Sequence, residues 1–160
     1  GTSLAEARDH ERVRVLADSV EATGRRSLFP RDRLLHHFLR GLVLAGAGRH
    51  EDAVREFRAA LHSPSQGYTR IIYELGKSLL ALHRPAEAIG ILRAPLHGGL
   101  EGSGLYLTRT EVHELLARAF DAAGQRDSAA AHYAIVARVW RDADPPLAQR
   151  RDAAQRYAAR

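Results

Sequence analysis

The chain contains no cysteine and no methionine among its 160 residues. The lack of cysteine excludes disulfide bonds, thiolate metal sites and cysteine nucleophiles. No stretch approaches the roughly 18 consecutive apolar residues of a membrane helix and no signal peptide pattern opens the chain, so we expect no membrane contact. Without methionine the chain cannot begin at its own initiator, and we interpret it as a piece of a longer, bacterial protein. We expect a cytoplasmic location.

Lysine is also scarce, because Lys77 is the only one and the net charge of +5 comes almost entirely from arginine. Residues 34–137 carry eleven basic and ten acidic side chains, whereas residues 138–160 carry six arginines against three aspartates. A nucleic-acid-binding face needs arginines gathered on one side with aromatic or polar readers among them. The interspersed charges argue against such a face, and only the arginine-rich C-terminal end keeps this alternative open.

Hydrophobic residues make up 45% of the chain, enough for a continuous core, and their spacing recurs. In three segments a small residue is followed by an apolar residue three positions later, by alanine twelve later and by a bulky apolar residue sixteen later. The small residues are 35 and then 41 residues apart. The three sets are Gly41, Leu44, Ala53 and Phe57; Gly76, Leu79, Ala88 and Leu92; and Ala117, Phe120, Ala129 and Tyr133.

Each of these units is predicted to be a pair of amphipathic helices joined by a tight turn. Gly48 and Gly124 suit the left-handed conformation that ends a helix. Asp127 suits the N-cap of the helix that follows, and Thr108 with Glu111 forms the T-x-x-E pattern of a capping box. Small residues at the first skeleton position allow the paired helices to approach, and the bulky residue fills the space between them.

The order of small residue, leucine or phenylalanine, alanine and bulky residue resembles the tetratricopeptide repeat over about residues 34–141. The resemblance implies a right-handed α-solenoid of antiparallel helix pairs. The repeats are predicted at about 34–66, 69–95 and 109–141, with an insertion at 96–108. With one further helix at each end, we predict an all-α fold of about eight helices.

The flanking segments are predicted to cover the two ends of the repeats. Residues 1–33 are expected to form an N-terminal helix, over 4–22 and ending near Gly24, and a connector. Residues 142–160 are expected to form a C-terminal capping helix that starts after Asp144. Its apolar face is thin and its other face is highly charged.

The insertion at 96–108 is the least repeat-like stretch, since it contains four glycines and follows Pro95. A flexible connector is one interpretation. Leu100, Leu105, Tyr106 and Leu107 are too apolar for a simple linker, and the second interpretation is that they pack over a groove or meet a partner.

In the tetratricopeptide family the concave face, lined by the first helix of each unit, holds a peptide, a helix or a partner protein. The resemblance therefore implies a protein-protein interaction module. The mapped groove is apolar at one end, basic and aromatic in the middle and largely acidic at the far end, which favours a ligand with an apolar anchor and charges of both signs. The predicted partner-binding residues are Leu35, Phe38, Leu42, Arg70, Tyr73, Lys77, Glu111, Glu114, Arg118 and Asp121. Alternatively, the N-terminal helix fills the apolar end and the rest is an ordinary solvated surface.

The family's best-known groove chemistry is a clamp of lysine, asparagine and arginine side chains around a C-terminal carboxylate. At the matching positions this chain has no asparagine, and Glu114 places a negative charge among them. We therefore expect no binding of acidic chaperone tails.

Motifs of catalytic or metal-binding chemistry fail on inspection. Gly76, Lys77 and Ser78 end like a phosphate-binding loop, but Ile71 replaces its first glycine and the segment lies within a predicted helix. The nine histidines are dispersed along the chain, which favours packing or surface roles. We predict no catalytic residues, no metal site and no cofactor, and therefore no enzyme.

Two functional classes remain open. The first is a protein-binding or homodimerising module of a larger bacterial regulatory or signalling protein. The second is a nucleic-acid-associated regulatory domain that uses the arginine-rich C-terminal helix.

Overall fold

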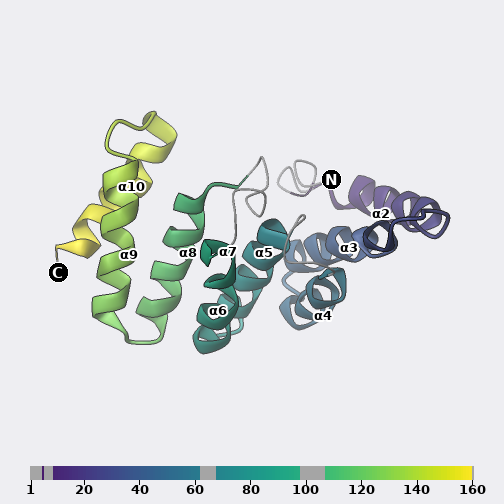
Figure 1. The fold of residues 1–160 in the computed structure, drawn as a ribbon, viewed down its shortest axis with the longest axis horizontal. Helices are drawn as coiled ribbons and strands as arrows, with labels where there is room; N and C mark the ends of the chain where they lie inside the picture. The colour runs from purple at the N-terminus through teal and green to yellow at the C-terminus, as the bar shows by residue number, and fades with distance from the viewer. Residues whose placement is uncertain (1–4, 6–8, 62–67, 98–106, 160) are drawn as a thin grey trace.

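The computed structural model describes residues 5, 9–61, 68–97 and 107–159. These residues form an all-helical fold, without a strand in the part described. Figure 1 shows the helices following one another in chain order along the longest axis. They are α2 (His10–Gly24), the 3-10 helix η1 (Pro30–Arg33), α3 (Leu35–Gly46), α4 (His50–Ala60), α5 (Tyr68–Ala81), α6 (Pro85–Leu92), the short α7 (Ala94–His97), α8 (Arg109–Ala122), α9 (Arg126–Val139) and α10 (Pro145–Ala158).

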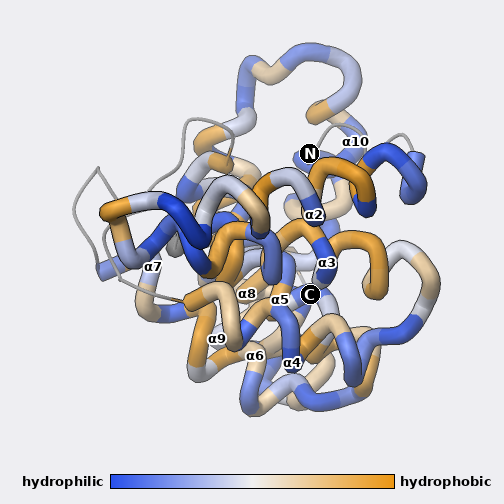
Figure 2. The backbone as a smooth tube through the Cα atoms, turned by 90° about the vertical axis from the view of Figure 1, so that its right-hand side faces the viewer, coloured by the Kyte–Doolittle hydropathy of each residue, from blue (hydrophilic) through white to orange (hydrophobic). Residues whose placement is uncertain are grey.

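Helices that are neighbours in the sequence pack against each other. The strongest contacts join α3 to α4, α8 to α9, and α2 to α3, and α5 packs on both α4 and α6. At the C-terminal end α10 packs on α9, and α6 contacts α8 across the insertion. Weaker contacts join α3 to α5 and α5 to α8, which brings these three helices together. Along the helices hydrophobic and hydrophilic stretches alternate, as the amphipathic pattern predicts (Figure 2).

The small residues of the repeated skeleton lie where two helices approach most closely. A Cβ atom added at Gly41 would come within 2.5 Å of the ring of Phe57, and one added at Gly76 would come within 3.0 Å of Leu92. The prediction that small and bulky positions pack against each other is confirmed in these two units. The alanines of the skeleton are fully buried in all three units: Ala53, Ala88 and Ala129.

The turns after α3, α5 and α8 share one backbone geometry. Gly48 and Gly124 have φ of +75° and +73°, which confirms the predicted left-handed conformation. In the middle turn, which has no glycine, His83 takes this conformation with φ of +56°. In each turn the residue after the left-handed one donates its N–H to a carbonyl five residues earlier, as in a Schellman motif. These hydrogen bonds are Arg49 to Leu44, Arg84 to Leu79 and Gln125 to Phe120, each 2.9 Å.

The predicted helix caps are confirmed in one case and wrong in another. Thr108 and Glu111 form the capping box at the start of α8, with side chain and backbone bonded in both directions. Asp127 does not cap α9, because the helix begins at Arg126 and Gln125 occupies the N-cap position. The N–H of Gln125 closes the turn that ends α8, and α9 begins at the next residue, Arg126. Asp127 lies in the first turn, where its negative charge still favours the helix.

The ends of the chain follow the predicted boundaries in part, because α2 begins at His10 and Asp9 lies outside it, whereas a helix over 4–22 was predicted. The N-terminal helix α2 ends at Gly24, as expected, and the side chain of Asp9 caps its start by accepting from the N–H of Arg12 at 3.3 Å. The C-terminal helix α10 starts directly after Asp144. The insertion falls largely on 98–106, outside the described residues, so the predictions for Leu100, Leu105 and Tyr106 stay predictions. Leu107, which the structure describes, is buried with 3% exposure. No helix in the described ranges is both long and apolar enough to cross a bilayer.

Candidate functional site

A hollow of about 460 Å³ lies where α3, α5 and α8 come together, and we call it the central hollow. Three of the predicted partner-binding residues line it, one from each helix: Leu42, Lys77 and Arg118. Much of its wall is apolar. The other lining residues are Ala5, Ala45, Gly46, His50, Glu74, Ser78, Leu80, Ala81 and Leu115.

A buried carboxylate at this hollow, that of Glu74, lies close to two cationic side chains. Glu74 is only 6% exposed, and its Oε2 atom lies 2.8 Å from Nζ of Lys77. The Nε atom of Arg70 lies 3.7 Å from the other carboxylate oxygen. A buried carboxylate is costly without such cationic partners. Two of the three cations predicted for the groove, Arg70 and Lys77, are therefore shared with Glu74, a residue that the mapping of the concave face left out.

The guanidinium of Arg118, unlike the cationic groups of Arg70 and Lys77, is not close to Glu74 in any ion pair that the described residues form. Its side chain is exposed, and it makes no hydrogen bond or ion pair with any residue that the structure describes. Because an exposed arginine keeps its full charge and five donors, it offers an unused anchor for a carboxylate. The central hollow thus combines apolar walls with one free cation and one shared cation.

Tyr73 lies beside the central hollow on α5. Nζ of Lys77 is 5.8 Å from the centre of its ring, a cation-π distance. Burial, together with the charges of Glu111 and Glu114, raises the pKa of the Tyr73 hydroxyl to about 12. The phenol therefore stays neutral at physiological pH.

The predicted acidic end of the groove is covered by side chains of α10. Nε of Arg150 lies 3.1 Å from both carboxylate oxygens of Glu114, and its Nη2 also donates to that carboxylate. The hydroxyl of Tyr157 donates to the carboxylate of Asp121. Both acids are thus paired within the chain. A positively charged ligand would have to compete with α10 for them.

Arg150 and Tyr157 were missed by the mapping of the groove, although the sequence carries a signal for them. Each lies 36 residues after its partner, Glu114 or Asp121. This separation is close to the spacing of the repeated units, so α10 presents the positions that the first helix of a further unit would present. Arg150 is held additionally by Trp140, whose ring lies 4.7 Å from its guanidinium carbon.

The residues predicted for the apolar end of the groove do not lie together, because Leu42 lines the central hollow and Leu35 does not. Leu35 is 40% exposed and lines a separate hollow of about 360 Å³ between α2 and α3. Phe38 is half-buried with its ring 6.0 Å from that of Phe57. An ion pair of 2.6 Å between Arg40 and Glu21 also joins α3 to α2. The structure does not join these two residues to Leu42 in one surface.

Two histidine contacts link the helices of a pair at equivalent positions of the first and third units. Nδ1 of His37 lies 2.7 Å from a carboxylate oxygen of Glu56, and Nδ1 of His113 lies 2.7 Å from Nδ1 of His132. In both pairs the partners are 19 residues apart. Among the residues described, no three histidine, aspartate or glutamate side chains gather as a metal site.

Neither the models of protein families nor the curated proteins contain a match to the chain.

Proposed function

We propose that this chain is a tetratricopeptide-like, right-handed solenoid of antiparallel helix pairs that binds a segment of another protein in the central hollow. The architecture is supported by the recurring skeleton and by the shared turn geometry after α3, α5 and α8. Glycines that pack against bulky residues at equivalent positions support it further. Three units of this kind are about the number that a stack of repeats needs to bury a continuous core.

The observation that carries the binding proposal is the free guanidinium of Arg118 beside apolar walls. Leu42, Leu80 and Leu115 supply apolar surface within the same hollow. Ligand sites in proteins combine such surface with a few polar groups that fix orientation. We therefore expect a ligand segment with one bulky apolar side chain and a carboxylate placed to reach Arg118.

The pairing of Glu114 and Asp121 with α10 narrows the ligand chemistry. Because these acids already have partners, the bound segment does not need positive charge at that end. The sequence predicts a ligand with charges of both signs. We now propose a ligand that is apolar and acidic.

Selection of peptides from a random library displayed on phage tests this proposal with the chain as it exists. The wild-type chain should enrich peptides that combine a bulky apolar residue with an acidic one. For the best peptide, Arg118→Glu should weaken the affinity at least about tenfold, the size of one lost charge-assisted contact. Arg138→Glu is the matched control, since Arg138 is exposed on α9 and makes no hydrogen bond or ion pair with the described residues.

Two outcomes would contradict the proposal. One is a selection with no enrichment over the Arg118→Glu variant. The other is an enriched peptide whose affinity, measured by calorimetry, is the same for Arg118→Glu and Arg138→Glu.

The nucleic-acid alternative needs the arginines of α10 to face outward. Two of the three arginines of α10 are engaged within the chain, because Arg150 pairs with Glu114 and Arg151 donates to Asp152 and to the carbonyl of Arg141, while Arg156 is exposed. These contacts favour the protein-binding proposal. A titration with duplex DNA checks it, because phosphate binding would weaken steeply between about 50 and 200 mM salt. Tight binding with such a slope would support the alternative.

A further inference from the structure

The loop that joins α2 to α3 carries two exposed apolar side chains at one end of the molecule. We call residues 25–33 the tip. Leu28 is 93% exposed and Phe29 is 68% exposed, more than any other large hydrophobic residue in the described part of the chain. The tip lies at the end of the longest axis where α2 turns back toward α3 (Figure 1). Single exposed apolar residues are common on protein surfaces, whereas exposed apolar side chains that lie together can mark an interaction site.

Internal contacts hold the tip in one shape. The hydroxyl of Ser27 donates to the carboxylate of Asp32 at 2.7 Å, and the N–H of Phe29 donates to the Ser27 oxygen at 3.1 Å. At the base of the tip a Cβ atom on Gly24 would lie 2.3 Å from the carbonyl oxygen of Asp32, so only glycine allows this closure. The exposed pair is therefore presented by a defined loop, which lowers the entropic cost of binding.

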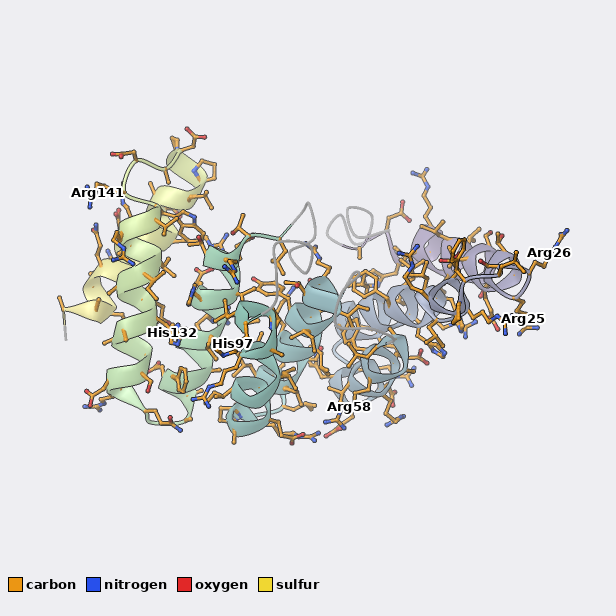
Figure 3. All side chains as sticks on the ribbon, in the orientation of Figure 1. Arg25, Arg26, Arg58, His97, His132 and Arg141 are labelled. Carbon is orange, nitrogen blue, oxygen red and sulfur yellow. The ribbon has the colours of Figure 1, made fainter. Side chains whose placement is uncertain are left out.

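The apolar pair stands among positive charges. The tip contains Arg25, Arg26, Arg31 and Arg33 against the single acid Asp32, a net charge of +3. The side chains of Arg26 and Arg33 are exposed and form no ion pair with any described residue. Figure 3 shows Arg25 and Arg26 at the same end of the molecule.

We propose that the tip binds the surface of a membrane that contains anionic lipids. Leu28 and Phe29 enter the interfacial region, and the surrounding arginines contact the headgroup phosphates. Such a surface binds a membrane in two ways: its apolar side chains are buried in the interfacial region, and its positive charges are attracted to the negative surface potential of the lipids. The proposal revises the expectation of no membrane contact, because surface binding needs no spanning helix.

Two features favour a lipid surface over a protein as the occupant. A standard protein interface buries about 800 Å² on each side. The tip offers only two strongly exposed apolar side chains, which suits insertion into an interface better than a face-to-face contact. Its unpaired arginines complement lipid phosphates without requiring a fixed geometry from the partner.

Sedimentation with vesicles tests the proposal on the full chain. The probe is a mixture of phosphatidylglycerol and phosphatidylcholine in about a one-to-two ratio, compared with phosphatidylcholine alone. We expect the wild-type chain to sediment with the anionic vesicles and to be released by salt. The double variant Leu28→Ser/Phe29→Ser should bind at least about tenfold more weakly. The double variant Arg26→Gln/Arg33→Gln should lose roughly fivefold for each arginine.

Matched controls lie at the opposite end of the molecule, where Figure 3 labels Arg141. Arg138→Gln/Arg141→Gln removes two exposed arginines there, and Val139→Ser removes a valine that is 56% exposed. Neither change should alter sedimentation. All substituted side chains are on the surface, and unchanged thermal unfolding by circular dichroism shows that the variants remain folded.

Fluorescence locates the contact independently. In a Phe29→Trp variant, lipids with brominated acyl chains should quench the new tryptophan. Trp140, the only natural one, is buried at the other end and serves as the internal control. Quenching limited to the variant supports the proposal. Absence of sedimentation, or sedimentation that the tip variants do not change, overturns it and leaves a protein with an apolar cleft and acidic rim as the occupant.

Discussion

Nδ1 of His113 on α8 lies 2.7 Å from Nδ1 of His132 on α9. At this distance one nitrogen donates and the other accepts, so the contact is lost if both rings are fully protonated. Burial lowers the pKa of both imidazoles. The charges of His132 and Arg109 lower that of His113 further, and the charge of Arg93 lowers that of His132. The ring of Phe120 stacks on His132 with the centroids 5.4 Å apart.

This pair makes stability depend on pH. The pKa of both rings is lower in the folded chain than in the unfolded chain, so the unfolded chain binds more protons at mildly acidic pH. The free energy of unfolding should therefore be highest above about pH 6.5 and fall as the pH decreases toward the folded pKa values. Urea unfolding at about pH 7.5 and about pH 5 measures this slope.

The double variant His113→Gln/His132→Gln should flatten the slope, because glutamine does not titrate. Some slope remains, since burial also lowers the pKa of His36. His97→Gln, an exposed position on α7, is the control and should leave the slope unchanged. An equal slope in the double variant and the wild-type chain would refute the assignment.

Gly41 is required by the close approach of α3 and α4. The added Cβ of Gly41→Ala would press against the fully buried ring of Phe57, so we expect a loss of about 1–3 kcal/mol in the free energy of unfolding. Gly90 is the matched control, because it is exposed in α6 and nothing lies within 4 Å of an added Cβ. Gly90→Ala should increase stability by roughly 0.5–1 kcal/mol. Chemical denaturation of both variants measures the contrast, and two changes of the same sign would contradict it.

His83 occupies a position where glycine fits better. Its φ of +56° is unfavourable for a residue with a Cβ atom. His83→Gly should therefore stabilise the chain by about 1 kcal/mol, whereas Gly48→Ala, at the equivalent position, should destabilise it by about as much. Thermal unfolding detects both shifts. If His83→Gly lowers the melting temperature, the side chain of His83 makes a contribution that outweighs its backbone strain.

The contact between Glu114 and Arg150 fixes α10 against α8. A double-mutant cycle with Glu114→Gln and Arg150→Gln should give a coupling energy of about 1 kcal/mol, at the upper end for partly exposed pairs. The exposed pair of Asp52 and Arg55 within α4 is the comparison and should give only about 0.3 kcal/mol. Coupling below that of the exposed pair would show that packing alone positions α10.

Much of the fold was predictable because it follows from short-range rules. Gly48, Gly124 and the pair of Thr108 with Glu111 act through the backbone of their own turn, and the structure confirms all of them. The middle turn was not marked by a glycine, yet His83 takes the left-handed conformation there and the turn closes with the same hydrogen bond, from Arg84 to Leu79.

The candidate site was predictable only in part. The register of the first helices identified Leu42, Lys77 and Arg118, which the structure brings into one hollow. It did not identify Glu74, because the sequence alone does not distinguish a buried glutamate on a helix from an exposed one. Arg150 was missed because the mapping did not extend the repeat spacing to α10, where Arg150 lies 36 residues after Glu114.

Helical periodicity, turn residues and small-to-bulky spacing were thus sufficient for the all-helical fold and for most helix boundaries, because each acts over a few residues of chain. Which charges are paired and which are free was decided by distances between helices. Arg118 is free while Arg150 is held by Glu114, and His113 meets His132 although 19 residues separate them. Such pairings depend on how side chains of separate helices face each other, and no pattern along one helix contains that information.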